Sequence, residues 1–319
     1  MEGGTCLQHC PVMEQMVLRM LLHEQPAVYV DCTLGAGGHA RALLRASTAG
    51  STVLAIDRDS ACITAAQQWA APWAEHFHPI HGNFRTLTAL LTTLGYPCVD
   101  SILFDLGVSS YQLDTAARGF SFQREGPLDM RMDTTQAMTA AALVNQASVD
   151  ELRRILQEFG EERWATRIAR AIVAERQHAP ITTTRHLAAL VARTIPRAAW
   201  PTDIHPATRV FQGLRIAVND ELQALREALP QAVQALRPGG RLGIIAFHSL
   251  EDRHVKQFLL QEARGCTCPP RWPQCTCGHR PRLKLLTRKP FRPTPQEVQD
   301  NPRSRSARLR VAEKLAVEE

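Results

Sequence analysis

The sequence predicts an α/β protein built on one parallel sheet, with an all-helical segment inserted after the fourth strand. Apolar, β-branched runs alternate with helical patterns through the first 112 residues. This spacing is typical of a parallel sheet that helices cover on both faces. The alternation then stops, and residues 113–207 show helix and loop patterns only. A strand pattern returns at 241–247, so the simplest architecture is a single interrupted sheet.

The expected strands are short apolar runs, most of which end in a polar residue. They cover residues 28–32, 52–57, 77–81, 100–105 and 241–247. Helical patterns cover residues 39–46, 60–70 and 84–94, and in the insertion 149–159, 161–176 and 182–194. Thr182 or Thr183 is available to cap the last of these helices. A long helix is expected over Val210–Leu236, and two β-like runs at 283–287 and 307–312 predict an edge pair that closes the sheet.

The composition is ordinary for a soluble globular enzyme, with 319 residues, 45% hydrophobic and 21% charged. No apolar run approaches the roughly 20 residues that a membrane-spanning helix needs. The first residues lack the basic and apolar regions of a secretion signal. Nine cysteines fit reduced thiols better than a disulfide framework. We therefore expect a cytoplasmic enzyme with no membrane contact and no evident obligate protein partner.

Positive charge is concentrated near the C-terminal end of the chain. Between Arg264 and Arg310 there are twelve Lys or Arg residues against two acids, while the whole chain carries +6. The remaining chain is therefore acidic by about four charges. A basic segment on a mildly acidic enzyme suggests a polyanionic partner, with nucleic acid the first candidate. A solvated basic tail is the plainer alternative.

A glycine-rich turn is the most informative local feature. The strand pattern at 28–31 ends in Asp31, three glycines follow at 35, 37 and 38, and a helical pattern begins at His39. This arrangement lets a ligand approach main-chain N–H groups at a helix start. Asp57 ends the next strand eighteen residues after His39, where an acid is placed to accept hydrogen bonds from a ribose. The turn therefore predicts a nucleoside-containing cofactor.

The glycine spacing favours S-adenosylmethionine over a nicotinamide dinucleotide. The dinucleotide pattern is G-x-G-x-x-G, with a gap before the third glycine. Here the spacing is Gly35-x-Gly37-Gly38, and Asp31 before it suits an ammonium group better than a pyrophosphate. A nicotinamide cofactor, or a glycine turn with only a packing role, stays open at this point.

Asp105 is the candidate catalytic residue. It follows the apolar run at 102–104, and ligands of parallel sheets bind beyond the carboxyl ends of strands. Methyl transfer to an exocyclic amine needs an acceptor that orients the N–H groups and exposes the nitrogen lone pair. A strand-end aspartate that only caps the following turn is the alternative.

The end of the fifth strand offers two further side chains. Phe247 could stack on an extruded nucleobase, and His248 could contact a phosphate or a base, although a structural role for His248 is equally compatible with the sequence. Ser249 is the expected N-cap of the helix that follows.

A cysteine cluster lies in the basic segment. It consists of Cys266, Cys268, Cys275, Cys277 and His279. Its composition is similar to that of a small zinc knuckle. The C-x-C spacing is tighter than the usual C-x₂₋₄-C, and no helix pattern follows it. A metal site and a reduced cysteine loop both remain open.

Ten ordered motifs carry a family resemblance. They are Asp31-x-Thr33-x-Gly35-x-Gly37-Gly38-His39, Ala55-Ile-Asp57-Arg58-Asp59, His81-Gly82-x-Phe84, Asp105-Leu-Gly-Val-Ser-Ser-x-Gln112-Leu-Asp114, Arg118-Gly-Phe-Ser-Phe, Gly126-Pro-Leu-Asp-Met-Arg-Met-Asp133, Gly160-Glu-Glu-Arg163, Pro206-Ala-Thr-Arg209, Phe247-His-Ser-Leu-Glu-Asp-Arg253 and Asn301-Pro-Arg-Ser-Arg-Ser-Ala-x-Leu-Arg310. Together they resemble the bacterial small-subunit ribosomal RNA cytosine-N4 methyltransferase family, known as MraW or RsmH. The resemblance runs nearly from end to end.

The resemblance implies a class I S-adenosylmethionine-dependent methyltransferase (Rossmann-like) sheet formed by residues 1–112 and 208–319. The helical insertion, residues 113–207, would then recognise RNA. The implied reaction is methylation of the N4 amine of one cytidine in the decoding centre of 16S ribosomal RNA, with the small ribosomal subunit as partner. The cofactor contacts that it implies are Gly37, Gly38, His39, Asp57, Phe84, Asp105 and Gln112. It assigns no metal ligands.

The expected mechanism is direct in-line methyl transfer without a covalent enzyme–base adduct, because an exocyclic amine carries its own lone pair. An amino-methyltransferase acting on another RNA or on DNA is the nearest rival. A ribosome assembly factor that binds the cofactor without catalysis belongs to a different class, and a nicotinamide oxidoreductase is the third alternative.

Overall fold

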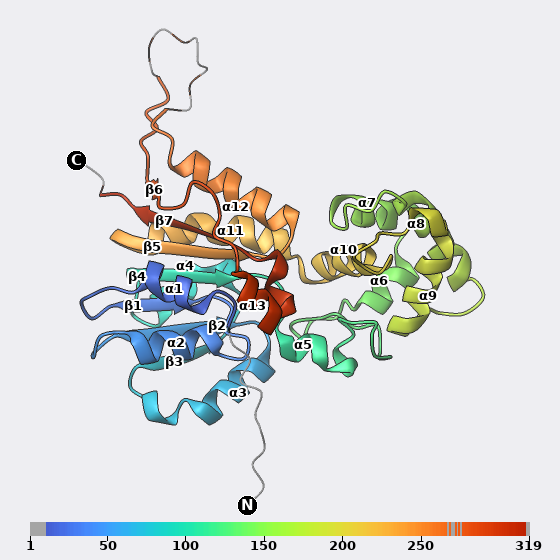
Figure 1. Cartoon of the computed structure of the whole chain (residues 1–319), viewed down its shortest axis with the longest axis horizontal. Coiled ribbons are helices and arrows are strands. Elements are labelled where there is room, and N and C mark those ends of the chain that lie inside the picture. The colour runs from blue at the N-terminus through green and yellow to red at the C-terminus, as the bar shows by residue number, and fades with distance from the viewer. Residues whose placement is uncertain (1–10, 267, 269–271, 273, 275, 317–319) are drawn as a thin grey trace, which may run out of the picture. The chain divides into compact units, whose positions relative to one another are not determined.

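The computed structural model describes residues 11–266, 268, 272, 274 and 276–316. The chain divides into two compact units. One is formed by residues up to 107 together with those from 224 onward, and the other by residues 108–223. The discontinuous unit carries the sheet, and the other unit is helical (Figure 1). Within the described ranges, no helix is long and apolar enough to cross a membrane.

The discontinuous unit contains a seven-stranded sheet in the order β3-β2-β1-β4-β5-β7-β6. Its strands are β1 (Val28–Asp31), β2 (Thr52–Asp57), β3 (Phe77–His81), β4 (Val99–Asp105), β5 (Leu236–Ala246), β6 (Leu283–Leu285) and β7 (Arg308–Lys314). β1 to β5 pair in parallel, whereas β7 runs antiparallel to both β5 and β6. The predicted α/β class, with its edge pair and its helical insertion after the fourth strand, is therefore confirmed.

Helices cover both faces of this sheet. The helices that pack on it are α1 (Glu14–Leu21), α2 (Gly38–Ala46), α3 (Ser60–Trp69), α4 (Leu87–Thr93), α11 (Glu221–Ala235) and α12 (Ser249–Glu262), and the unit also contains the short α13 (Pro295–Asp300). Successive residues of β1 point to opposite faces. Val30 packs in one core with Leu229 of α11, and Tyr29 packs in another with Leu43 of α2. Because both faces are covered, the central strands are apolar along most of their length.

The helical unit has a core of its own. Its helices are α5 (Ser110–Asp114), α6 (Ala140–Gln146), α7 (Val149–Glu158), α8 (Ala165–Arg176), α9 (Thr184–Thr194) and α10 (Thr208–Asn219). Leu152, Ile168 and Leu187 are fully buried in one apolar cluster. Thr183 is the N-cap of α9, since its side-chain oxygen accepts a hydrogen bond from the His186 N–H at 3.2 Å.

The single long helix predicted over Val210–Leu236 is wrong. α10 ends at Asn219, and Asp220 has φ 49° and ψ 41°, in the left-handed region that interrupts a helix. The Asn219 side chain donates to the Met130 carbonyl at 2.7 Å and accepts from the Met132 N–H at 2.8 Å. The end of α10 is thereby tied to the irregular loop that precedes α6.

Candidate active site

Three aspartates stand at the carboxyl ends of neighbouring strands. Asp31 ends β1, Asp57 ends β2 and Asp105 ends β4. β1 lies between β2 and β4, and the strand order reverses beside it. Ligands of open α/β sheets bind outside the strand ends at such a reversal. The structure thus brings the predicted acids together at the edge where a cofactor site is expected.

The glycine turn is a tight connection between β1 and α2. The Gly37 N–H donates to the Leu34 carbonyl at 2.7 Å, and the Leu34 N–H donates to the Ile56 carbonyl at 2.9 Å. Gly35 and Gly37 have φ values of 52° and 80°. Residues with a side chain rarely adopt this left-handed conformation, so the turn depends on glycine at both positions.

The turn also leaves no room for side chains at its end. A Cβ on Gly37 would lie 2.4 Å from the Trp69 ring, and one on Gly38 would lie 3.0 Å from Pro11. The Arg41 guanidinium stacks over the Trp69 ring, 4.4 Å from its centroid. Sequence reasoning did not find these supporting roles of Trp69 and Pro11, because both come from packing between segments that are distant in the chain.

Asp57 holds the glycine turn against the end of β2. Its Oδ2 accepts from the Gly35 N–H at 2.7 Å and its Oδ1 accepts from the Asp59 N–H at 2.8 Å. Burial raises the pKa of Asp57, and these two hydrogen bonds oppose that effect. Each carboxylate oxygen has two lone pairs, so a further contact is chemically possible. Its contact with a ribose remains a prediction.

Thr33 links the ends of β1 and β4. The Asp105 N–H donates to Thr33 Oγ1 at 2.7 Å, and the Thr33 N–H donates to Asp31 Oδ1 at 3.1 Å. His39, at the start of α2, is 5% exposed, and its Nε2 lies 3.5 Å from Asp105 Oδ2. This separation is too long for a strong hydrogen bond but close enough for an ion pair. Asp31, His39 and Asp105 therefore form one cluster.

Opposite charges on His39 and on the two aspartates stabilise this cluster. Burial raises the pKa of Asp31 to about 6, and the neighbouring His39 opposes the shift. Burial lowers the pKa of His39, but the carboxylates of Asp105 and Asp31 outweigh it, and the net shift is upward. Among the described residues, Asp31 Oδ2, Asp105 Oδ1 and both ring nitrogens of His39 are buried without a hydrogen-bond partner. Unpaired buried polar atoms are rare, and at a strand-end edge they favour a ligand site.

Replacing Asp31 with asparagine is expected to change how stability depends on pH. The folded-state pKa of Asp31 is about 6, above its ordinary value of 3.8. Its contribution to stability is therefore fully present below about pH 4 and is lost as the pH rises through about 6. Relative to wild type, the free energy of unfolding of the variant should rise by about 1–3 kcal/mol as the pH increases from 4 to 7. Denaturant unfolding across this range measures the effect, and a difference that stays constant with pH would contradict it.

Two of the predicted cofactor contacts have structural roles as well. Phe84 packs edge-on against Phe104, with ring centroids 5.5 Å apart. Gln112 belongs to the helical unit, where its side-chain oxygen accepts from the Ser109 N–H at 3.0 Å and completes the cap of α5. Contacts of Phe84 and Gln112 with a cofactor remain predictions.

The end of β5 corrects one expectation. The N-cap of α12 is His248 rather than Ser249: His248 Nδ1 accepts from the Glu251 N–H at 3.4 Å, and Glu251 Oε2 accepts from the Phe247 N–H at 2.8 Å. His248 thus has the structural role that the sequence left open.

The Phe247 ring lies beside Gly107, which has a φ of 103°. A Cβ built on Gly107 would be 3.7 Å from this ring. Phe247 is therefore close to the end of β4.

Part of the C-terminal positive charge is used inside the fold. Arg308 and Arg310 of β7 pair with Asp252 at 2.8 and 2.7 Å. Burial alone would raise the pKa of the Asp252 carboxyl. Hydrogen bonds from Arg310 and Arg308 outweigh this effect, and the net shift of the pKa is downward. Arg282 pairs with Glu262 at 2.6 Å. These arginines stabilise the β7 side of the sheet, so the basic segment is not simply a solvated tail.

Comparison with known proteins agrees with this architecture. Residues 6–315 match the MraW methylase family. A relative from Thermomicrobium roseum, named ribosomal RNA small subunit methyltransferase H, is 55% identical over 316 residues, which cover 99% of this chain and 96% of the relative. Relatives of the same name from Geobacter sulfurreducens and Pelobacter propionicus are 52% and 50% identical, covering 96% and 97% of this chain and 99% of each relative. The chain belongs to the MraW methylase family.

Proposed function

We propose that this chain transfers the methyl group of S-adenosylmethionine to the N4 amine of a cytidine in the 16S RNA of the small ribosomal subunit. The observation that carries the proposal is the unpaired carboxylate oxygen of Asp105, located beside a glycine turn at the reversal of the strand order. Membership of a methylase family and the names of the relatives support the same reaction.

The residues present fit S-adenosylmethionine. This cofactor carries an ammonium and a sulfonium cation, and Asp31 Oδ2 is a buried acceptor without a partner among the described residues. Gly37 and Gly38 allow close approach to the backbone at the start of α2. Asp57 would accept from the ribose, with Phe84 and Gln112 as further predicted contacts. When bound, the cofactor supplies an electrophilic methyl group.

Asp105 is the residue that would orient the acceptor amine. Its carboxylate accepts a hydrogen bond from one N–H of cytosine N4, which turns the nitrogen lone pair toward the cofactor side of the site. Transfer would form a carbon–nitrogen bond, break the carbon–sulfur bond and leave a proton to be lost from nitrogen. The Asp105 carboxylate would be the acceptor for that proton. No cysteine nucleophile is needed, because the amine attacks directly.

The helical unit offers side chains suited to RNA. Exposed Arg163 and Arg167 lie 5.5 and 5.9 Å from the ring centroid of Trp164. Arg197 lies 3.9 Å from the ring of Trp200. Cationic and aromatic surfaces of this kind bind phosphates and unstacked bases. They support the proposal that residues 113–207 recognise the RNA substrate.

A methylation assay on purified components tests this function. The full chain is incubated with methyl-labelled S-adenosylmethionine and either small ribosomal subunits, naked 16S RNA or DNA, and modified nucleosides are identified by mass spectrometry. We expect N4-methylcytidine in ribosomal RNA and none in DNA. Label in DNA would favour the rival amino-methyltransferase. Cofactor binding without any labelled cytidine would favour an assembly factor.

A further inference from the structure

Residues 263–282 connect α12 to β6. The base of this segment is closed at Arg282, whose N–H donates to the Glu262 carbonyl at 2.8 Å and whose Nε lies 2.6 Å from Glu262 Oε2. Between these anchors, the described residues belong to no helix or strand, and none of them is buried. Trp272 is 57% exposed. Burial of apolar side chains therefore does not order the described part of this segment.

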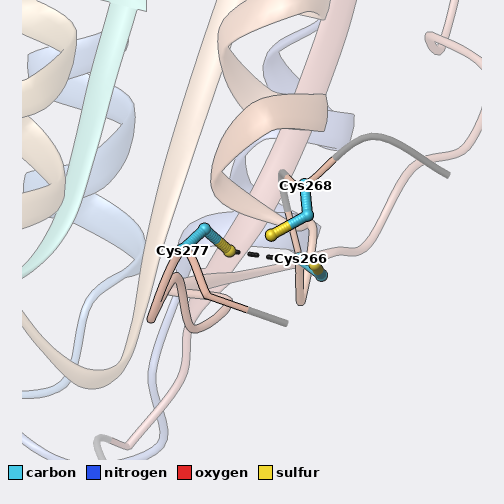
Figure 2. A group of neighbouring side chains, drawn as sticks. All are labelled: Cys266, Cys268 and Cys277. Carbon is cyan, nitrogen blue, oxygen red and sulfur yellow. Dashed lines mark hydrogen bonds between the residues drawn. The ribbon is translucent and has the colours of Figure 1, made fainter. Parts of the chain in front are cut away.

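Three thiols converge within this segment. The sulfur atoms of Cys266, Cys268 and Cys277 all lie within 4.8 Å of one another. Figure 2 shows their side chains directed toward a common point from the two arms of the segment. These cysteines are exposed or partly exposed, so their convergence needs a physical explanation other than burial.

The separation of the sulfur atoms fits metal coordination. Cys266 Sγ and Cys277 Sγ are 3.8 Å apart. Two thiolates bound to tetrahedral zinc at about 2.3 Å are themselves about 3.8 Å apart. A disulfide would bring the atoms to about 2.0 Å, and neither cysteine is in a disulfide. Soft thiolate ligands select zinc over the hard cations magnesium and calcium.

We propose that Cys266, Cys268 and Cys277 bind one zinc ion that orders the segment 263–282. Because none of the segment's described residues is buried, the binding free energy of the metal would supply folding free energy here. The three thiolates fill three positions of a tetrahedron and leave the fourth to water or to another side chain. Cys275, the remaining cysteine of the sequence cluster, lies outside the described residues.

Metal analysis of the full, tag-free chain tests the proposal. After expression with zinc in the medium and gel filtration without chelators, inductively coupled plasma mass spectrometry should find about one zinc per chain. Cys266→Ser and Cys277→Ser should each lower the zinc content by about tenfold. Cys98→Ser is the matched control, because Cys98 is an exposed free cysteine outside the cluster, and it should keep the wild-type content.

Two further measurements on the wild-type protein test the metal site without relying on the cysteine variants. Cobalt(II) added to metal-free wild-type protein should give the intense visible absorption of tetrahedral thiolate coordination, which requires no variant to fold. Removal of the metal should speed protease cleavage within 263–282 by about tenfold.

The proposal is overturned by less than about half an equivalent of zinc in the wild type, or by equal zinc in Cys266→Ser and Cys98→Ser. A Cys266–Cys277 disulfide in the protein as purified without chelators would overturn it in favour of a redox pair. None of these measurements depends on methylation, so they are independent of the proposed function.

Discussion

Replacing Asp105 with alanine is expected to lower the rate of methyl transfer by about 10²–10⁴-fold. The side chain carries a buried oxygen without a partner among the described residues and is 24% exposed overall, as expected of a group that meets a substrate. Its removal leaves the incoming amine without an acceptor. The Asp105 N–H bond to Thr33 Oγ1 does not involve the side chain, so the junction of β1 and β4 should persist. Single-turnover methylation of small subunits measures the rate.

Calorimetric titration with S-adenosylhomocysteine separates loss of cofactor affinity from misplacement of the amine. Asp105→Asn should retain an intermediate rate, because its amide oxygen still accepts a hydrogen bond but carries no charge. Asp300→Ala, which removes an exposed aspartate at the end of α13, is the control and should leave the rate unchanged. Near-normal turnover and cofactor affinity in Asp105→Ala would refute the role of this residue.

Replacing Gly37 with alanine is expected to destabilise the fold by about 2–4 kcal/mol. The new Cβ would require a φ of 80° and would lie 2.4 Å from the Trp69 ring. Because the backbone of the turn must move to relieve this clash, binding of S-adenosylmethionine should weaken by about tenfold or more. Thermal unfolding and calorimetric titration measure the two effects.

Gly95→Ala separates backbone strain from the clash. Gly95 has the same φ of 80°, but a Cβ there would meet nothing within 4 Å. The Gly95→Ala variant should lose only about 1 kcal/mol in free energy of unfolding and keep its affinity for S-adenosylmethionine. Adding Trp69→Ala to Gly37→Ala should restore part of the lost affinity, because it removes the clashing ring. Equal losses of stability and of cofactor affinity in Gly37→Ala and Gly95→Ala would show that the contact with Trp69 affects neither.

Features encoded by local patterns could be predicted from the sequence. The first five strands follow apolar runs, and Asp31, Asp57 and Asp105 end their strands where the patterns end. Binary patterning and turn residues act within a few positions, so they fix where strands stop. The parallel order of β1, β2 and β4 then brings these acids to one edge.

Features that depend on tertiary contacts were missed. Trp69 supports the glycine turn from α3, and no periodic signal distinguishes it from an ordinary core residue. Asp57 ties the turn to β2 through Gly35, a contact that spacing alone did not reveal. The break at Asp220 had a local signal, because aspartate tolerates the left-handed region, but the apolar pattern of the flanking helices hid it.

The most direct test is the modification state of the ribosomal RNA in cells. Small-subunit RNA is isolated from a strain that lacks this gene, and from the same strain complemented with the wild-type chain or with Asp105→Ala. Nuclease digestion and mass spectrometry then locate methylated cytidines. We expect one N4-methyl group in the decoding region to be absent without the gene, restored by the wild type and not restored by Asp105→Ala. An unchanged methylation pattern in the deletion strain would contradict the proposed function.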